Sequence, residues 1–345
     1  MTASSPTPRS GAVTLHDVAR EAGVSLATAS RALNGSSRKV ADSYRDRVQA
    51  AADRLGYSAN LSAQATARGT SATVALLVAD IADPYFGEIA AGVARGADEA
   101  GLIVTIAITE RDPVREVALV RALRGQRPQA LILAASRTSA GDSEELSAEL
   151  AQLTAAGGRV VALGPGSSAP RSVTIDNVGA ARALGGALAR QGYRRALVLA
   201  ADDGTVTSDQ RVAGFTGGFT AAGGELVQVL RGGFSRSSGY DLMTQALAAG
   251  VEVGTVVFGV SDIIAIGAVA ALRDAERRIG DDIAVAGFDD IPSARDLTPA
   301  LTTVRVPLQD VGYAALRAAT DDDWEPSTEP LPFEVLVRDS TPPRT

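Results

Sequence analysis

The residues with the clearest chemical character lie in a short stretch, GVSLATASRALN, at positions 23–34. If its apolar residues are buried on one side of a helix, the opposite side carries Ser25, Leu26, Ala27, Ser30 and Arg31. The guanidinium group of Arg31 suits a bidentate hydrogen bond to a guanine edge, and a leucine with no core to fill can meet a thymine methyl group. This face therefore has the chemistry of a surface that contacts DNA bases.

Catalytic and metal-binding chemistry has few candidate residues. The chain has no cysteine and one histidine, His16, which we expect on a helix surface. Thiolate nucleophiles, Cys-based zinc sites and a histidine base beyond residue 16 are thus excluded. Three acidic pairs remain as candidates for acid-base catalysis: Asp202-Asp203, Asp281-Asp282 and Asp289-Asp290. Residues that are neighbours in sequence seldom converge on one substrate. We expect neither an enzyme nor a metal site.

A glycine-rich segment, GPGSSA at residues 164–169, matches the G-x-G-x-x-A pattern of dinucleotide-binding loops. Pro170 and a β-like segment follow it, where the pattern requires the N-terminus of a helix to face the pyrophosphate. The sequence therefore predicts no bound cofactor.

Three short helices are predicted around the base-contacting face. Thr14 and Asp17 have the spacing of a capping box, so a helix of about nine residues begins there and ends at Gly23. A third helix is expected over residues 42–55, ending at Gly56. We predict a helix-turn-helix domain over residues 13–58, preceded by a disordered arm at residues 1–12.

The charge distribution supports this division. The whole chain has a formal charge of −7, from 33 basic and 40 acidic residues. Residues 1–70 hold nine basic and five acidic residues, a balance of +4, which leaves 24 and 35, or −11, for residues 71–345. A small basic domain on a large acidic body is typical of a module that binds a polyanion.

From residue 73 onward, short β-branched runs alternate with alanine-rich helical segments, which predicts parallel sheets covered by helices. Eleven strands are too many for one sheet, so the predicted fold is α/β: a two-lobed, doubly wound parallel-sheet body preceded by the all-α head. We expect one lobe at about 73–175 and 299–325, and the other at about 176–298 and 326–340. The expected crossovers lie near Asp176, Thr298 and Pro326.

The head resembles that of the LacI/GalR family of bacterial transcription regulators. The similar segments read VTLHDVAREAGVSLATASRALNGSS and RVQAAADRLGY, and the resemblance extends over nearly the whole chain. It implies that Leu26, Ala27 and Arg31 read bases in the major groove. It also implies phosphate contacts from Thr14, Thr28, Ser30 and Asn34.

The resemblance also predicts a hinge at residues 59–72 that folds on the operator. Asn60 and Ala63 match the family pattern. Thr66 occupies the position of a leucine that wedges into the minor groove, so we expect weaker kinking of the operator than in leucine-bearing relatives.

In the body, the segments DPYFG, SDIIA and GFDD follow predicted strands and resemble the effector-binding segments of the same family and of periplasmic sugar-binding proteins. The expected effector-binding residues are Tyr85, Phe86, Arg111, Thr207, Arg211, Ser261, Asp262 and Asp289. Gly164-Pro165 and Ser261 depart from family positions that often carry Asp and Asn. This weakens the expectation of a sugar and leaves other effectors open, such as a nucleoside.

Taken with the resemblance, the sequence predicts a cytoplasmic, homodimeric repressor that binds a pseudopalindromic operator and is controlled by a small effector between two lobes. It shows neither an export signal nor a membrane span, and its tail, residues 338–345, lacks the heptads of a tetramerising coil. Two alternatives remain: a solute-binding protein without a regulatory role, and an enzyme on the same scaffold.

Overall fold

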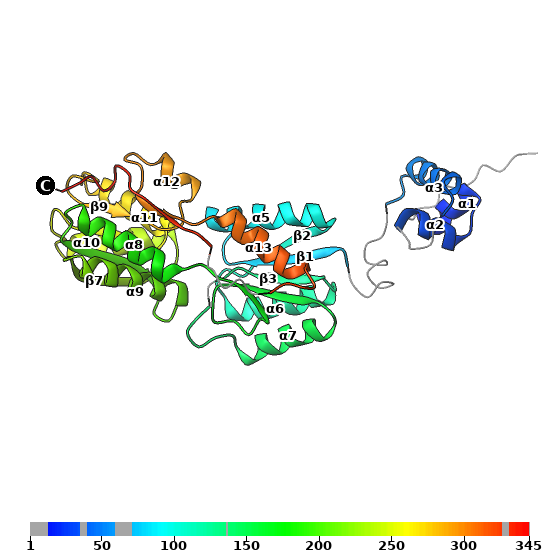
Figure 1. Ribbon diagram of the computed structural model, residues 1–345, viewed down its shortest axis with the longest axis horizontal. Helices are drawn as coiled ribbons and strands as arrows, with labels where there is room; N and C mark the ends of the chain where they lie inside the picture. Colours follow the sequence, from blue (N-terminus) through cyan, green and yellow to red (C-terminus); the bar gives the residue numbers. More distant parts are fainter. Residues whose placement is uncertain (1–12, 35–39, 59–70, 136, 326–330, 345) are drawn as a thin grey trace, which may run out of the picture. The chain divides into compact units, whose positions relative to one another are not determined.

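The computed structural model describes residues 13–34, 40–58, 71–135, 137–325 and 331–344, and the chain separates into two compact units. The head lies within residues 1–68 and the body within residues 69–345 (Figure 1). The expected arm at 1–12 lies outside the described residues, as does the expected hinge apart from Ser71 and Ala72.

The head consists of three helices, α1 (Leu15–Ala22), α2 (Leu26–Asn34) and α3 (Asp42–Leu55). The capping box of α1 is confirmed: the Thr14 side chain accepts from the Asp17 amide, and the Asp17 carboxylate accepts from the Thr14 amide at 3.0 Å. Gly23 ends α1 with φ +63°, a conformation that disfavours a side chain. The buried core is small: Val18, Ala19, Ala22, Ala29, Val48, Ala51 and Ala52.

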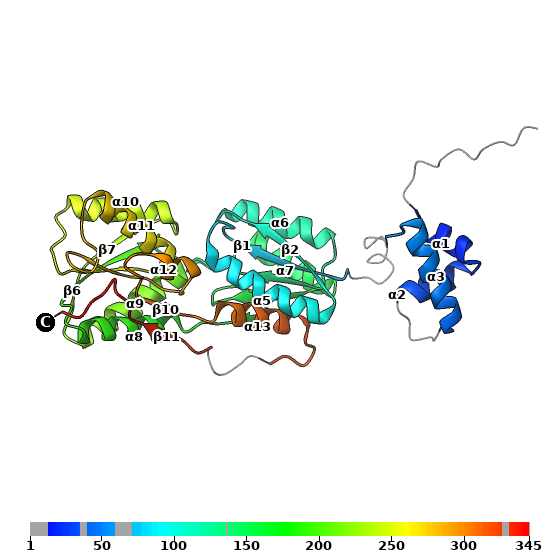
Figure 2. The same cartoon turned by 90° about the horizontal axis from the view of Figure 1, so that it is seen from above.

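The first lobe of the body is built on a parallel sheet of order β2-β1-β3-β4-β5. Its strands are β1 (Thr73–Val78), β2 (Ile103–Ile108), β3 (Ala130–Leu133), β4 (Arg159–Leu163) and β5 (Arg171–Val173). Side chains alternate along β1, with Leu76 packing under one face and Leu77 under the other. One face is covered by α5 (Pro84–Ala100) and α13 (Leu308–Thr320), the other by α6 (Pro113–Gly125) and α7 (Glu144–Ala155) (Figure 2).

The second lobe contains a parallel sheet of order β7-β6-β8-β9. Its strands are β6 (Arg195–Ala201), β7 (Glu225–Gly232), β8 (Val256–Gly259) and β9 (Ala284–Ala286). Its helices are α8 (Asn177–Arg190), α9 (Val206–Ala221), α10 (Arg236–Ala248), α11 (Asp262–Asp274) and the short α12 (Pro292–Asp296). α8 packs against α9, and α10 packs against α11, so both faces of the sheet are buried, as predicted for a doubly wound fold.

A two-stranded antiparallel sheet lies where the chain crosses between the lobes, formed by β10 (Thr303–Arg305) and β11 (Glu334–Leu336). The amide of Gly287 donates to the Thr302 carbonyl at 2.8 Å, and the amide of Asp289 donates to the Val304 carbonyl at 2.8 Å. β10 is therefore attached to the second lobe, and the expected crossover near Thr298 is too early. The chain reaches α13 of the first lobe only after Arg305.

The other expected features can be placed briefly. Asp176 is the N-cap of α8, so the chain leaves the first lobe between β5 and α8. The expected crossover near Pro326 lies outside the described residues. The glycine-rich segment after β4 leads into β5, which removes the helix that a dinucleotide loop requires. In the described part of the chain, no helix is long and apolar enough to cross a membrane.

Candidate functional site

One face of α2 is open to solvent in the head. Ser25, Leu26, Ala27 and Arg31 are exposed, whereas Ala29 is buried against the other two helices. Leu26 is 40% exposed even though it is apolar. The structure thus brings the predicted base-contacting residues together on one free helical surface of the head.

The predicted phosphate contacts differ in how they are held. The hydroxyl groups of Ser25 and Thr28 lie 2.8 Å apart, and the Thr28 amide donates to Ser25 Oγ at 3.1 Å, so Ser25 stabilises the start of α2. Thr14 is engaged in the capping box, and Ser30 is half-buried. The Asn34 side chain and the hinge residues Asn60, Ala63 and Thr66 lie outside the described residues.

In the body, Arg211 on α9 is the centre of a buried polar cluster and is 1% exposed. Its Nε donates to Asn177 Oδ1 at 2.9 Å, and its Nη1 donates to the Val260 carbonyl at 2.9 Å. Its Nη2 lies 2.9 Å from Asp289 Oδ1 in a buried ion pair. The guanidinium also lies over the Phe288 ring, 3.8 Å from the centroid. Tyr85 is a third predicted effector residue close to Arg211 and Asp289, because the charges of both affect its hydroxyl group.

Burial dominates the ionisation of this cluster. It raises the pKa of Asp289 from 3.8 to about 7, although Arg211 favours the charged form. Burial also raises the pKa of the Tyr85 hydroxyl, with a further contribution from the charge of Asp289. Asp83, the N-cap of α5, likewise has a raised pKa because it is buried.

Asp262 is fully buried next to this cluster. Its carboxylate accepts a hydrogen bond from Thr303 Oγ1 at 2.6 Å and another from the Ile291 amide at 3.0 Å, and burial raises its pKa well above 3.8. It joins the loop after β9 to β10. The preceding Ser261 is buried, and its hydroxyl has no hydrogen-bond partner within the described part of the protein. Thr207 lies one turn before Arg211 on α9.

A cavity of about 540 Å³ lies between the lobes, bordered by the loops after β2, β3, β6 and β7. Of the predicted effector residues, only Arg111 lines it. The Arg111 guanidinium lies 5.0 Å from the centroid of Phe234, another lining residue, and 6.0 Å from that of Phe86. Arg111 and the two phenylalanines therefore connect the cavity to the buried cluster around Arg211.

The cavity wall contains an arginine that the sequence analysis missed. Arg137 donates to both carboxylate oxygens of Glu116 at 2.8 Å, and its Nε lies 3.4 Å from Asp142 Oδ1. Within the described part of the chain, neither Arg137 Nε nor Asp142 Oδ1 has a hydrogen-bond partner, although both atoms are buried. A donor on Arg137 and an acceptor on Asp142 are therefore left without hydrogen bonds beside the cavity.

The backbone beside Arg137 joins the two lobes. Its carbonyl accepts from the Val206 amide at 3.0 Å, and the Ser139 amide donates to the Gly204 carbonyl at 2.7 Å. Thr138 and Thr205 form an antiparallel bridge between these bonds. The loops after β3 and β6 thus close one side of the cavity. Phe234 and Arg137 both follow predicted strands, but the sequence does not show that Arg137 pairs with Glu116 or that its backbone joins the other lobe.

Comparison with known proteins agrees with this arrangement. A family model described as "Bacterial regulatory proteins, lacI family" matches residues 14–60, and "Periplasmic binding proteins and sugar binding domain of LacI family" matches residues 71–321. The chain belongs to the LacI family. The two matched regions correspond to the head with its exposed α2 face and to the two-lobed body.

Relatives in the LacI family match the chain over most of its length. GalS of Salmonella typhimurium, an HTH-type transcriptional regulator, is 34% identical over 89% of this chain and 89% of its own. DegA of Bacillus subtilis, another such regulator, is 28% identical over 96% of this chain and 98% of its own. The chain is therefore an HTH-type transcriptional regulator.

Solved structures of LacI-family proteins have the same fold. The lac repressor dimer bound to operator and the anti-inducer ONPF is 26% identical, with a TM-score of 0.80 over 96% of this chain and 100% of that one. A complex of the regulator CelR with cellobiose is 30% identical, with a TM-score of 0.68 over 95% and 99% of the two chains.

Proposed function

We propose that this LacI-family regulator is a cytoplasmic repressor that binds a pseudopalindromic operator as a homodimer and is controlled by a small polar effector held between its lobes. The observation that carries the DNA-binding half is the free face of α2, with Leu26 exposed and Arg31 beside it. Leu26 is apolar yet exposed beside Arg31, and a thymine methyl group can cover it.

In this proposal Leu26, Ala27 and Arg31 contact base edges, and Thr14, Ser25, Thr28, Ser30 and Asn34 contact phosphates or fix the start of α2. Asn60, Ala63 and Thr66 contact the central minor groove from the hinge. Dimerisation is supported by the lac repressor relative, whose structure is that of a dimer on operator DNA. Two heads then bind two half-sites.

The effector is proposed to be a polyhydroxylated molecule such as a sugar. Supporting observations are the cavity of about 540 Å³, within the range of pockets that enclose small ligands, and the CelR relative crystallised with cellobiose. Phe86, Arg111 and Phe234 would contact its ring faces. Tyr85, Thr207, Arg211, Ser261 and Asp289 would fix the hydrogen-bonding pattern once the lobes open, while Asp262 holds the loops in place. We propose no catalytic step on this ligand.

The DNA-binding role is tested by selecting duplexes from a random library with the full-length protein and measuring binding of the selected duplex. We expect affinity to fall steeply with salt. Arg31→Ala should lose about 1–3 kcal/mol and relax base preference at one position. Arg31→Lys is the matched control, because it keeps the charge but loses the planar fork. If Arg31→Ala instead weakens binding equally for all duplexes and Lys restores the affinity, Arg31 contacts a phosphate instead of a base.

The effector is tested by thermal unfolding of the full chain with cellobiose, ribose and cytidine. A ligand at about 100 times its Kd adds about 2.7 kcal/mol to folded-state stability. Phe234→Ala should weaken binding, whereas Phe333→Ala, a partly exposed phenylalanine that does not line the cavity, should not. Sugar binding without selection of any duplex would favour a solute-binding protein.

A further inference from the structure

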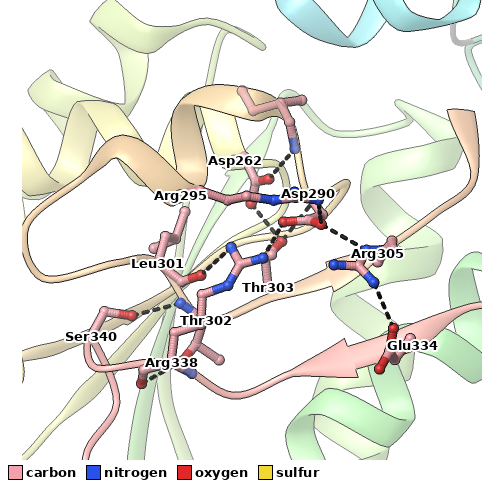
Figure 3. Close-up of polar contacts among 11 residues, drawn as sticks. Asp262, Asp290, Arg295, Leu301, Thr302, Thr303, Arg305, Glu334, Arg338 and Ser340 are labelled. Carbon is pink, nitrogen blue, oxygen red and sulfur yellow. Dashed lines mark hydrogen bonds and ion pairs between the residues drawn. The ribbon is translucent and has the colours of Figure 1, made fainter.

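Asp290, which directly follows Asp289 of the buried cluster around Arg211, is held by three arginines (Figure 3). Its side chain is 1% exposed. Oδ2 accepts from Arg295 Nη2 at 2.9 Å and from Arg305 Nε at 2.9 Å, and Oδ1 accepts from Arg338 Nη2 at 2.5 Å. Burial alone would raise the pKa of Asp290, but these hydrogen bonds hold it below its usual value. The carboxylate is therefore charged and fixed from three sides.

The three arginines come from three different segments, α12, β10 and the residues after β11. Arg305 also pairs with Glu334 on β11 at 2.9 Å. Arg338 donates to the Leu301 carbonyl at 3.0 Å, and its amide donates to Thr302 Oγ1 at 2.8 Å. One carboxylate thus ties together both strands that lie at the crossing between the lobes.

The peptide that joins Asp289 to Asp290 is strained. The two residues have φ values of +111° and +55°, although neither is glycine. Such conformations are unfavourable for residues other than glycine and persist only where the surroundings fix them. The surroundings here are two charged anchors, Arg211 on Asp289 and the three arginines on Asp290.

We propose that Asp290 is a positioning residue that transmits effector occupancy from Asp289 to the crossover strands β10 and β11. The inference depends on the proposed effector site. When a ligand replaces part of the Arg211–Asp289 pairing, the strained peptide turns, and Asp290 moves β10 through Arg305 and the C-terminal segment through Arg338. Because β10 continues into α13 of the first lobe, this movement changes the angle between the lobes.

The test compares Asp290→Asn with a matched control, Glu149→Gln. Asn fits the positive φ at position 290 and removes only the charge. Glu149 is also a buried carboxylate between arginines, Arg121 and Arg124, but it lies on α7, away from the crossover. In the full-length protein, cellobiose affinity and the Kd of the selected duplex with and without cellobiose are measured.

In allosteric proteins an effector typically changes the affinity for the other ligand by about 5–150-fold. We expect Asp290→Asn to bring the ratio of the two duplex Kd values, with and without cellobiose, close to 1. Cellobiose affinity should change less than the ratio does, and Asp290→Glu should restore part of the coupling. Glu149→Gln should keep the wild-type ratio. A ratio unchanged in Asp290→Asn, or lowered equally in Glu149→Gln, would overturn the proposal.

A second arm needs no ligand, so it separates this proposal from the choice of effector. Amide hydrogen exchange of residues 301–306 and 334–338 is measured in Asp289→Asn, Asp290→Asn and the double variant. We expect Asp289→Asn to accelerate amide exchange in both segments. In the double variant, exchange should be little faster than in Asp290→Asn alone. Additive effects would refute the transmission. If cellobiose does not bind but the effects are non-additive, only the choice of sugar fails.

Discussion

The burial of Asp289 beside Arg211 makes the stability of the body depend on pH. The pKa of Asp289 is raised to about 7, so between about pH 4 and 7 the folded protein keeps a proton that the unfolded chain has released. The contribution of Asp289 to the free energy of unfolding therefore falls as the pH rises, by at most about 1.4 kcal/mol per pH unit. Asp289→Asn should remove this slope, as measured by urea unfolding from pH 4.5 to 7.5.

Asp83 and Asp262 also have raised pKa values and remain in the variant, so the difference contains only the part of their titration that the charge of Asp289 alters. Asp202→Asn, at an exposed aspartate that lines the cavity, is the control and should follow the wild-type slope. A difference between wild type and Asp289→Asn that stays constant with pH would mean that Asp289 is ionised throughout this range.

At the scale of single residues, the sequence could indicate Asp289 because it follows a strand, β9. Arg211 lies within α9, so only the family resemblance could indicate it. Arg137 also follows a strand, β3, but the sequence does not show its partners. Its partner Glu116 lies on α6, and its backbone partner Val206 begins α9 of the other lobe. Its role depends on loop contacts between lobes, which local periodicity does not encode.

The pairing of α5 with α13 depends on close contact between their backbones. A Cβ atom at Gly92 would lie 1.9 Å from the Gln309 carbonyl oxygen, whereas one at Gly87, on the same helix, would meet nothing within 4 Å. Gly92→Ala should lower the free energy of unfolding by about 1–3 kcal/mol through overpacking. Gly87→Ala should raise it by about 0.5–1 kcal/mol, since alanine favours the helix.

Urea unfolding of both variants, followed by far-UV circular dichroism, measures whether the two changes in the free energy of unfolding have opposite signs. Equal effects would show that helix propensity, and not the approach of the two helices, controls the result. Both changes are from glycine to alanine on α5, so the comparison isolates the contact with α13.

At the scale of elements, alternation and capping signals were sufficient to predict the eleven strands and the three helices of the head. They were not sufficient to locate the crossover. The Thr298-Pro299 dipeptide marks a turn, but a turn signal does not say which lobe the next strand joins. That is decided by hydrogen bonds from Gly287 and Asp289 to the segment 302–304, which are distant in sequence.

The described residues form three hydrophobic clusters, two in the body and one in the head, and the cluster of the head is the smallest. Val48→Ala on α3 should cost about 1–3 kcal/mol of head stability, because it opens a cavity among small residues that cannot collapse around it. We expect loss of duplex binding on mild heating while the body stays folded. The single tryptophan, Trp324, lies in the body, so its fluorescence follows the body alone.

Val311→Ala is the matched control, because Val311 is also a fully buried valine on a helix, α13 of the body. It should lower the midpoint of the Trp324 transition and leave duplex binding intact below that temperature. If Val48→Ala instead shifts the Trp324 transition as far as Val311→Ala does, the head and the body unfold as one cooperative unit. Regulation would then be transmitted through shared stability, because a change in the body would alter the folding equilibrium of the head.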